Sequence, residues 1–496
     1  MRKKRLLYNT VCGLANQLIM LICNFILPRQ ILLFFGSEVN GLVTSITQFL
    51  GFIALTEMGI TAVVQASLYG PLARKDSEEI SRIVKSSKQF FNKIGALLFI
   101  YIFILCAVYP LISKGFSYGY IVPLIISISI NSIAQYYFGM TNLLLLYADQ
   151  KSYIPLLFNS ASIIANTVLS IIMMRMGATI QVVKFVASIA LLIKPVGISL
   201  YVNRHYQIDK SIQLNGEPIK QKWNGVAQHI ASFVLSHTDV MVLTLFSTLS
   251  NVSVYNVYYM VVAGIRQIIT TATIGVESLL GNLYAEKNAN LPNVFSAYEW
   301  LIHTFVTLIF ADSAILICSF VSVYTKGITD ANYINPAFGV LLVTAYALYS
   351  IRLPYNSMVI SAGHFKETQT SAIIEALINV LLSVILVQYY GLLGVSIGTV
   401  IAMTYRTCYL AMYLRNSILN RPIKHFIKHI VVDLITILLI ALIALNIPTA
   451  VNSYFEWLFV AVKVFCLSFL VTIAVNIILY RNEMISTFWL LKSKAK

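Results

Sequence analysis

Long apolar runs constrain this chain more than any other feature of its sequence. Hydrophobic stretches long enough to form membrane helices follow one another along nearly all of the 496 residues, and only 11% of the residues are charged. About 20 consecutive apolar residues are needed for a helix to cross the hydrocarbon core of a bilayer. So little polar surface could not cover a water-soluble globule of this size. The sequence therefore predicts an all-α polytopic membrane protein and excludes a soluble enzyme.

The spacing of the runs predicts about fourteen transmembrane helices. The predicted spans are 8–35, 41–68, 94–112, 120–147, 154–174, 180–202, 225–247, 252–283, 299–323, 337–360, 369–388, 391–413, 430–446 and 457–480. We expect an N-terminal six-helix lobe over 1–203, a cytoplasmic linker over 204–224, a C-terminal six-helix lobe over 225–415, and two additional C-terminal helices with a basic tail over 416–496. Residues 76–94 have the spacing of an amphipathic helix, which we expect to lie on the inner membrane surface.

A faint internal repeat relates the two predicted lobes. The run Asn166-Thr-Val-Leu-Ser, followed by Gly177, recurs as Asn379-Val-Leu-Leu-Ser, followed by Gly391. The copies fall on the fifth and eleventh predicted spans, six helices apart. Because six is even, two such bundles have a parallel pseudo-twofold relation about an axis along the membrane normal, an arrangement suited to alternating access. A chance match in a biased composition is the alternative.

Basic residues between the apolar runs account for the net charge of +16. They concentrate in alternate connections, and the outer loops carry only Lys114, Arg175, Lys184 and Lys326. By the positive-inside rule both termini are cytoplasmic. We read the charge as a topology signal and expect membrane lipids, not nucleic acid, as partners.

No catalytic or metal-binding motif is present in the sequence. The six cysteines lie apart in apolar segments, without a Cys-x-x-Cys pair and without histidines at ligand spacing. A phosphate-binding G-x-x-x-x-G-K-[ST] loop, a G-x-S-x-G elbow and an H-E-x-x-H helix are also absent. We therefore predict no catalytic residues, no metal and no cofactor, and expect that the protein is not an enzyme.

Basic residues inside the predicted spans are the first candidate site residues. Each costs about 2.5–3.5 kcal/mol at a helix centre, so such residues face a wet cavity or one another. Arg29 follows Pro28, Arg352 precedes Pro354, and Arg266 lies in mid-span. Guanidinium groups bind phosphate in a bidentate manner, so we predict that Arg29, Arg266 and Arg352 face a cavity that holds a pyrophosphate.

Acidic residues inside the spans have two readings. Glu57, Asp239 and Glu277 either couple transport to an ion or form salt bridges with cavity arginines.

Five further charged residues are expected to lie near span ends and extend toward the interface: Lys194, Arg406, Lys463, Glu375 and Asp433.

Two tyrosines at the start of the eighth span are candidates for sugar binding. Tyr255 and Tyr258 either stack on sugar rings or belong to an interfacial aromatic belt.

Short motifs along the chain, taken in their order, resemble the polysaccharide transporter family of the multidrug/oligosaccharidyl-lipid/polysaccharide exporter superfamily, particularly O-antigen and capsule repeat-unit flippases of Gram-positive bacteria. They are Arg5-Leu-Leu-Tyr-Asn9, Pro28-Arg29, Phe35-Gly36-Ser-Glu38-Val-Asn40-Gly41, Glu57-Met-Gly59, Tyr147-Ala148-Asp149-Gln150-Lys151, Thr238-Asp239, Val254-Tyr255-Asn256-Val257-Tyr258, Arg352-Leu-Pro354, Ala362-Gly363-His-Phe365-Lys366 and Gly391-Leu-Leu-Gly394. The resemblance spans nearly the whole chain.

The resemblance implies a fourteen-helix, V-shaped fold that moves undecaprenyl-pyrophosphate-linked oligosaccharide repeat units from the inner to the outer leaflet by alternating access. By similarity to the lipid II flippase branch, arginines of the first and eighth helices hold the pyrophosphate, which corresponds to Arg29 and Arg266 here. The last two helices would cradle the polyprenyl tail.

The leading hypothesis is therefore a flippase of the bacterial plasma membrane, acting in capsule, exopolysaccharide or O-antigen-type biosynthesis. A polysaccharide polymerase and chain-length machinery are its expected partners. The alternatives are a multidrug or other small-molecule exporter of the same superfamily, and a membrane polysaccharide polymerase or glycosyltransferase. The short outer loops disfavour the enzyme, because membrane glycosyltransferases generally place catalytic groups in sizeable outer loops.

Overall fold

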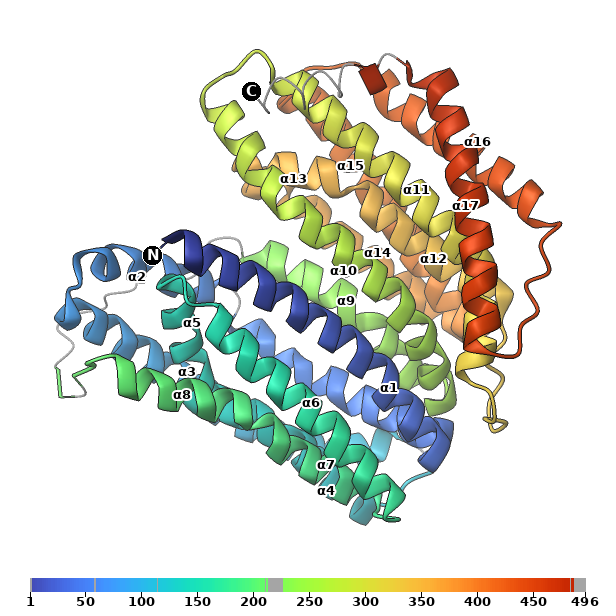
Figure 1. Cartoon of the computed structure of the whole chain (residues 1–496). Helices are drawn as coiled ribbons and strands as arrows, with labels where there is room; N and C mark the ends of the chain where they lie inside the picture. The colour runs from blue at the N-terminus through green and yellow to red at the C-terminus, as the bar shows by residue number, and fades with distance from the viewer. Residues whose placement is uncertain are drawn as a thin grey trace. The chain divides into compact units, whose positions relative to one another are not determined.

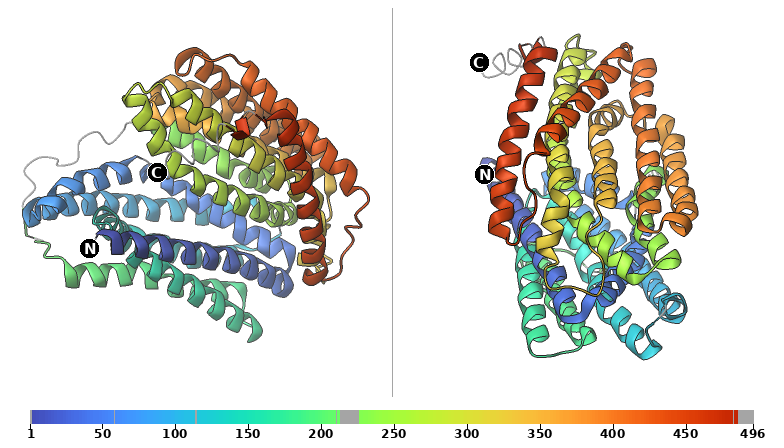
Figure 2. Two further views of the ribbon diagram at one scale, coloured as in Figure 1. Left: turned by 45° about the horizontal axis from the view of Figure 1, so that its top comes forward. Right: turned by 90° about the vertical axis from the view of Figure 1, so that its right-hand side faces the viewer.

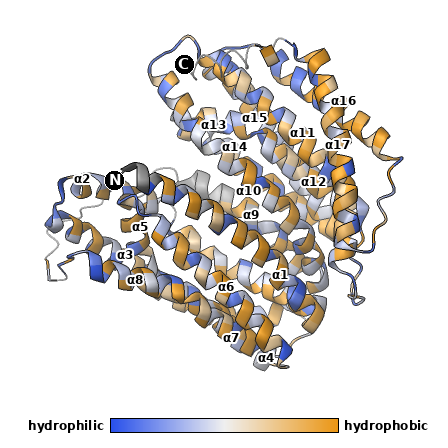
Figure 3. Cartoon of the chain, viewed as in Figure 1, coloured by the Kyte–Doolittle hydropathy of each residue, from blue (hydrophilic) through white to orange (hydrophobic). Residues whose placement is uncertain are grey.

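The computed structural model describes residues 2–57, 59–113, 115–209, 211–212, 226–481 and 483–485. This part of the chain consists of helices and short connections (Figure 1). Eleven of its helical segments are long and apolar enough to cross a membrane, and hydrophobic residues predominate along the helices (Figure 3). The prediction of an all-α polytopic membrane protein is confirmed. Most of the predicted linker, Lys114 and the basic tail lie outside the described residues.

Contacts divide the chain into two compact units. The N-terminal unit is Met1–Phe233 with Thr248–Ser253, and the C-terminal unit is Val234–Ser247 with Val254–Lys496. Within each unit, long helices run side by side (Figure 2).

The N-terminal unit holds ten helical segments in its described residues. They are α1 (Arg2–Gly51), η1 (Phe52–Glu57), α2 (Ile60–Arg74), α3 (Ser77–Ile112), α4 (Tyr118–Ala134), η2 (Gln135–Gly139), α5 (Met140–Ala148), α6 (Tyr153–Arg175), α7 (Ile180–Leu191) and α8 (Ile193–His205). The C-terminal unit holds most of α9 (Val226–Phe246) and α10 (Leu249–Ala285), with α11 (Leu291–Tyr324), α12 (Pro336–Ile351), α13 (Leu353–Ser361), α14 (Phe365–Tyr390), α15 (Leu392–Ser417), α16 (Lys424–Ala444) and α17 (Tyr454–Leu479).

A glycine breaks α1 between the first two predicted spans. Gly36 has φ 82° and ψ 178°, a backbone conformation outside the helical region that an L side chain rarely adopts. The helix is 50 residues long, about 75 Å at 1.5 Å per residue, and is therefore too long for one crossing. The break at Gly36 coincides with the gap between the predicted spans 8–35 and 41–68.

The helix predicted over 76–94 is present, but it does not end before the third predicted span. Asp76 caps the helix as expected, since its side chain accepts a hydrogen bond from the Glu79 N–H at 2.9 Å. The helix then continues without interruption to Ile112 as α3. Its apolar residues Phe91 and Ile94 are buried within the unit. The amphipathic face therefore packs against protein, and one continuous helix is formed.

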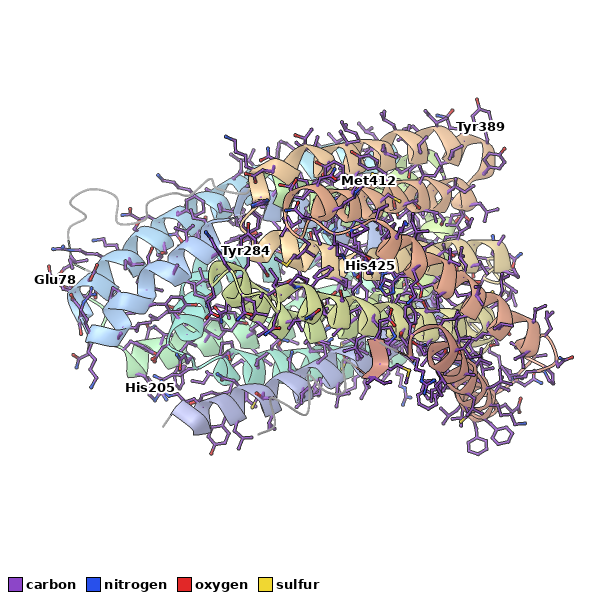
Figure 4. All side chains as sticks on the ribbon, turned by 90° about the horizontal axis from the view of Figure 1, so that it is seen from above. Glu78, His205, Tyr284, Tyr389, Met412 and His425 are labelled. Carbon is purple, nitrogen blue, oxygen red and sulfur yellow. The ribbon has the colours of Figure 1, made fainter. Side chains whose placement is uncertain are left out.

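Polar contacts join three parts of the chain at one end of the N-terminal unit, where Glu78 and His205 also lie (Figure 4). Asp149 receives hydrogen bonds from Arg5 at 3.4 Å and from the Tyr206 hydroxyl at 2.5 Å, and it pairs with Lys151 at 2.7 Å. Burial and the hydrogen bond to Asp149 raise the pKa of Tyr206 above its ordinary value. The motif around Asp149 thus joins the start of α1, the α5–α6 connection and the end of α8.

Helices α14 and α15 pack closely through glycines. A Cβ atom added at Gly394 would lie 2.2 Å from the Leu386 carbonyl oxygen, and one at Gly398 would lie 2.7 Å from the Ser383 hydroxyl. Small residues let helix backbones approach in this way, which favours helix association in membranes. Gly394 and Gly398 therefore set the distance between these helices.

A buried polar network attaches α16 and α17 to α11 and α13. Glu299 on α11 accepts a hydrogen bond from Tyr355 at 2.6 Å and pairs with Arg421. The His303 ring contacts Asp433 of α16 at 2.6 Å and the Tyr355 hydroxyl at 3.1 Å.

Two more contacts complete this network. His429 of α16 stacks on His303 with ring centroids 4.7 Å apart, and it bonds to Tyr480 at 2.6 Å. Asp433 is buried, so its predicted position at the interface is wrong: the carboxylate is held inside the protein by partners on α11.

Candidate functional site

Arg266 lies on an aromatic platform in the C-terminal unit. Its guanidinium carbon is 5.5 Å from the ring centroid of Tyr346 and 5.2 Å from that of Tyr349. The side chain is half-buried, and among the described residues it has no carboxylate partner. Cation–π contacts orient a guanidinium while leaving its five N–H donors available. This group can therefore bind an anion such as phosphate in a bidentate manner.

Arg352 differs from Arg266 although both were predicted to line the cavity. It is 8% exposed, forms a buried ion pair with Glu375 of α14, and lies over the ring of Tyr349 at 4.4 Å from the centroid. Arg352 is therefore a charge-paired residue that supports the Tyr349 ring, and its predicted role as a free cavity cation does not fit this arrangement.

Glu375 also pairs with a second arginine. Its other oxygen lies 3.8 Å from Nε of Arg406 on α15, which also donates to the Thr368 carbonyl at 2.9 Å. Glu375 and Arg406 are both buried. The expectation that they extend to the interface is wrong, because each finds its counter-charge inside the unit.

Asp239 on α9 lies among hydroxyl and amide groups of α10, α14 and α15. It accepts hydrogen bonds from the Tyr255 hydroxyl at 2.8 Å and the Thr399 hydroxyl at 3.0 Å. Asn379 donates to Thr399 at 3.0 Å, and its own Oδ1 is buried without a partner among the described residues. No ion pair to Asp239 is formed within the described chain. A carboxylate surrounded by neutral oxygen donors suits a hard cation or a proton.

Tyr255 and Tyr258 are buried, and both hydroxyls are engaged. Tyr255 donates to Asp239, while Tyr258 donates to the Tyr333 carbonyl at 2.7 Å and accepts from the Asn335 N–H at 3.1 Å. Neither ring is positioned for stacking on a sugar, because protein atoms cover both. Tyr258 instead anchors the connection between α11 and α12.

Three other predicted residues lie elsewhere. Glu277, near the end of α10, accepts a hydrogen bond from Ser357 of α13 at 2.9 Å. Arg29 is half-buried on α1 of the N-terminal unit, one residue after Pro28. Glu57 is half-buried at the end of η1, in a cavity of the same unit.

Solved structures with the same architecture are membrane transporters. A structure of the lipid II flippase MurJ in an inward closed conformation matches with a TM-score of 0.71 and 16% sequence identity, covering 96% of this chain and 99% of that one. The chain has the fold of this flippase.

Multidrug transporters match over a smaller part of the chain. An inward-facing multidrug resistance MATE family transporter of the MOP superfamily gives a TM-score of 0.56 at 14% identity, covering 82% of this chain and 94% of that one. The MATE multidrug transporter DinF-BH, solved as a complex, gives 0.53 at 15% identity, covering 84% and 95%. No protein-family model matches the sequence, and no curated protein sequence matches it significantly.

Sequence reasoning missed several residues that the fold brings to the site. Tyr346, Tyr349 and Thr399 are ordinary helix residues in the sequence, and only helix packing places them beside Arg266 or Asp239. Asn379 is the one residue that the sequence could have marked, because it belongs to the internal repeat. The repeat indicates topology, however, and does not indicate which residue Asn379 contacts.

Proposed function

We propose that the protein is a flippase that moves undecaprenyl-pyrophosphate-linked oligosaccharide repeat units from the inner to the outer leaflet of a bacterial plasma membrane by alternating access. The repeat units would supply capsule, exopolysaccharide or O-antigen-type biosynthesis, with a polymerase and chain-length machinery as later partners. Both termini are assigned to the cytoplasm. The likeness of the fold to a lipid II flippase supports this proposal.

The proposal rests on the surroundings of the Arg266 guanidinium. Its guanidinium lies against two tyrosine rings and has no carboxylate partner among the described residues. An unpaired cation at this depth is costly unless a ligand supplies the opposite charge. A pyrophosphate satisfies it, whereas a cationic drug would be repelled. Arg29 in the N-terminal unit is proposed as a second pyrophosphate ligand.

Asp239 is proposed as the coupling residue. Its carboxylate has hydroxyl and amide neighbours but no basic partner in the described chain, so binding of a cation or a proton changes the charge of the C-terminal unit. Substitution of Asp239 by Asn is expected to remove the dependence of transport on the coupling ion. Transport that keeps the same ion dependence in this variant would exclude Asp239 from coupling.

Reconstituted protein tests the flippase proposal. Undecaprenyl-pyrophosphate oligosaccharide is loaded in one leaflet of liposomes, and its appearance in the other is measured with an impermeant lectin. Arg266→Ala should slow translocation by about tenfold or more, because charge-assisted hydrogen bonds to the pyrophosphate are lost. Arg266→Lys should recover only part of the rate, since lysine lacks the planar donor fork. Arg175→Ala, at an exposed helix end, is the matched control.

A multidrug exporter is the second candidate, favoured by the likeness to MATE transporters. Translocation of no lipid-linked sugar by the wild type, together with efflux of cationic dyes from the same liposomes, would replace the flippase proposal with this one.

A further inference from the structure

A cavity with both charged and neutral polar residues in its lining lies inside the N-terminal unit, and Glu57 is the residue it shares with the candidate site described above. Its volume is about 410 Å³, within the roughly 300–1,000 Å³ typical of small-molecule sites. Its walls come from α1, η1, α4, η2, α5, α6 and α7. The polar residues that line it are Thr47, Glu57, Asn131, Ser132, Gln135, Tyr136, Asn166, Lys184 and Ser188.

Two opposite charges line this cavity without pairing with each other. Glu57 receives a hydrogen bond from Tyr136, but its Oε2 atom is buried and has no partner among the described residues. Lys184 has neither an ion pair nor a hydrogen bond to its ammonium group within the described chain. Its predicted position in an outer loop is wrong, since it lies on α7 and lines the cavity. Both side chains are half-buried, and a ligand that pairs with both supplies the counter-charges that the protein does not.

Neutral hydrogen-bonding groups line the same cavity. The side-chain amides of Asn131 and Gln135 line the cavity and make no hydrogen bond to other described residues. Both side chains are half-buried, so their donors and acceptors are available to water or to a ligand in the cavity.

The backbone is irregular where it borders this cavity. Gln135 and Tyr136 lie in η2, a single turn of π-helix in which the Met140 N–H bonds to the Gln135 carbonyl. Glu57 ends η1, a 3-10 segment. Single π turns within α-helices occur frequently at functional sites, because they re-aim side chains at a cost in stability.

The internal repeat gives this cavity a counterpart in the C-terminal unit. Asn166 on α6 lines the cavity with Lys184 of the following helix, and Asn379 on α14 contacts Thr399 of its following helix. A glycine with positive φ follows each asparagine helix within two residues of its end, Gly177 at 77° and Gly391 at 55°. The two units therefore place an asparagine in an interior polar site at matching positions, but only the N-terminal site holds a lysine.

We infer that the cavity of the N-terminal unit binds a small zwitterion, with the ligand's ammonium group at Glu57 and its carboxylate or phosphate group at Lys184. The amides of Asn131 and Gln135 supply further hydrogen bonds to its charged groups. A ligand of one charge sign leaves either the acid or the base unpaired, whereas a zwitterion neutralises both and keeps the cavity neutral. The same chemistry occurs in free amino acids and in the phosphoethanolamine headgroup of lipids. This inference does not depend on the proposed flippase function.

Thermal unfolding of the purified full-length protein tests the inference. The probes are glycine, β-alanine and γ-aminobutyrate, which separate the two charges by increasing distances, and phosphoethanolamine, which replaces the carboxylate by a phosphate. Acetate and methylammonium, alone and mixed, carry the same charges on separate molecules. We expect one zwitterion to raise Tm in a saturable manner, with a clear optimum in charge separation, and the single-charge probes to leave Tm unchanged. This series needs no variant, so it is informative even if substitutions impair folding.

Variants then test which side chain binds each charged group of the ligand. Glu57→Gln and Lys184→Met should each weaken the apparent affinity for the best zwitterion about tenfold or more. Lys194→Met is the matched control, because Lys194 is a half-buried lysine of the neighbouring α8 that does not line this cavity. It should bind the probe as the wild type does.

Two results would overturn the inference. One is that no zwitterion stabilises the wild type more than the acetate and methylammonium mixture does. The other is stabilisation by acetate alone that is lost in Lys184→Met but kept in Glu57→Gln, which would make this an anion site.

Nanodiscs distinguish the source of the ligand. Displacement of the best probe by phosphatidylethanolamine, but not by phosphatidylglycerol, identifies a lipid headgroup. Binding that neither lipid affects identifies a soluble zwitterion. Both results support the inference.

Discussion

Two arginines show how far a residue's role depends on its surroundings. Arg266 and Arg352 both lie in apolar helices and both contact the ring of Tyr349, at 5.2 and 4.4 Å. Glu375 neutralises Arg352, while Arg266 has no carboxylate partner among the described residues. The same side chain is thus a structural ion-pair partner in one position and an available anion ligand in the other.

The Tyr349 ring contacts both arginines. Its substitution removes the ring that orients the Arg266 guanidinium but leaves the charge of the arginine in place. Tyr349→Leu should slow lipid-linked oligosaccharide translocation about threefold to tenfold, because cation–π contacts are worth roughly 0.5–2 kcal/mol. Tyr349→Phe keeps the ring and should transport at nearly the wild-type rate. The liposome lectin assay measures both. An equal loss in the two variants would show that the hydroxyl, and not the ring face, is what matters.

At the scale of elements, glycines and buried charges determine which helices associate. The close approach of α14 and α15 requires the absence of a side chain at Gly394. The attachment of α16 and α17 depends instead on Glu299, which Arg421, Tyr355 and His429 surround. Hydrophobic burial alone cannot select a partner helix in lipid, because the lipid is equally apolar. Close packing and buried polar contacts therefore provide the specificity.

Gly394→Ala is expected to separate α14 from α15. The added Cβ would lie 2.2 Å from a backbone oxygen of Leu386, which cannot move without shifting the helix. We expect a cost of about 1–3 kcal/mol and a lower Tm of the purified protein. Gly119→Ala is the control, since a Cβ there meets no atom within 4 Å. Equal Tm values for the two variants would mean that the helices are less tightly packed than described.

Glu299→Gln is expected to loosen the last two helices. Removing one charge leaves Arg421 uncompensated, and breaking a buried pair typically costs about 3–5 kcal/mol. Limited proteolysis and thermal unfolding should show earlier cleavage near α16 and a lower Tm. Glu367→Gln, at an exposed site on α14, serves as control. Unchanged proteolysis in Glu299→Gln would show that apolar packing suffices to hold these helices.

At the scale of the whole molecule, the sequence predicted the class of fold but not its internal partnerships. Apolar runs locate membrane helices because lipid imposes a minimum length on each crossing. They do not reveal that His303 meets Asp433, 130 residues away, or that Arg352 meets Glu375, because those pairs depend on which helices pack together. Lys184 was misplaced for the same reason: a lysine near a span end resembles a loop residue until the cavity beside it is known.

Orientation in the membrane is the whole-molecule prediction that labelling can test. Single cysteines replacing Glu78 or His205, which lie at one end of the N-terminal unit, should react with an impermeant maleimide only after permeabilisation, because that end is assigned to the cytoplasm. A cysteine replacing Met176, exposed beyond α6, should react in intact cells. The background lacks the six native cysteines. The opposite labelling pattern would invert the assigned topology.

The network that attaches α16 joins residues that the ribosome synthesises at different times. His303 enters the membrane when Asp433, 130 residues later, has not yet been made. At roughly 5–20 residues per second, that interval lasts about 7–26 seconds. During this time Glu299 and His303 lie in lipid or at the insertion machinery without their partners from the last two helices. A nascent chain stalled before α16 would therefore present unmatched polar groups within the bilayer, a feature by which membrane quality-control proteases can distinguish an incomplete copy from a finished one.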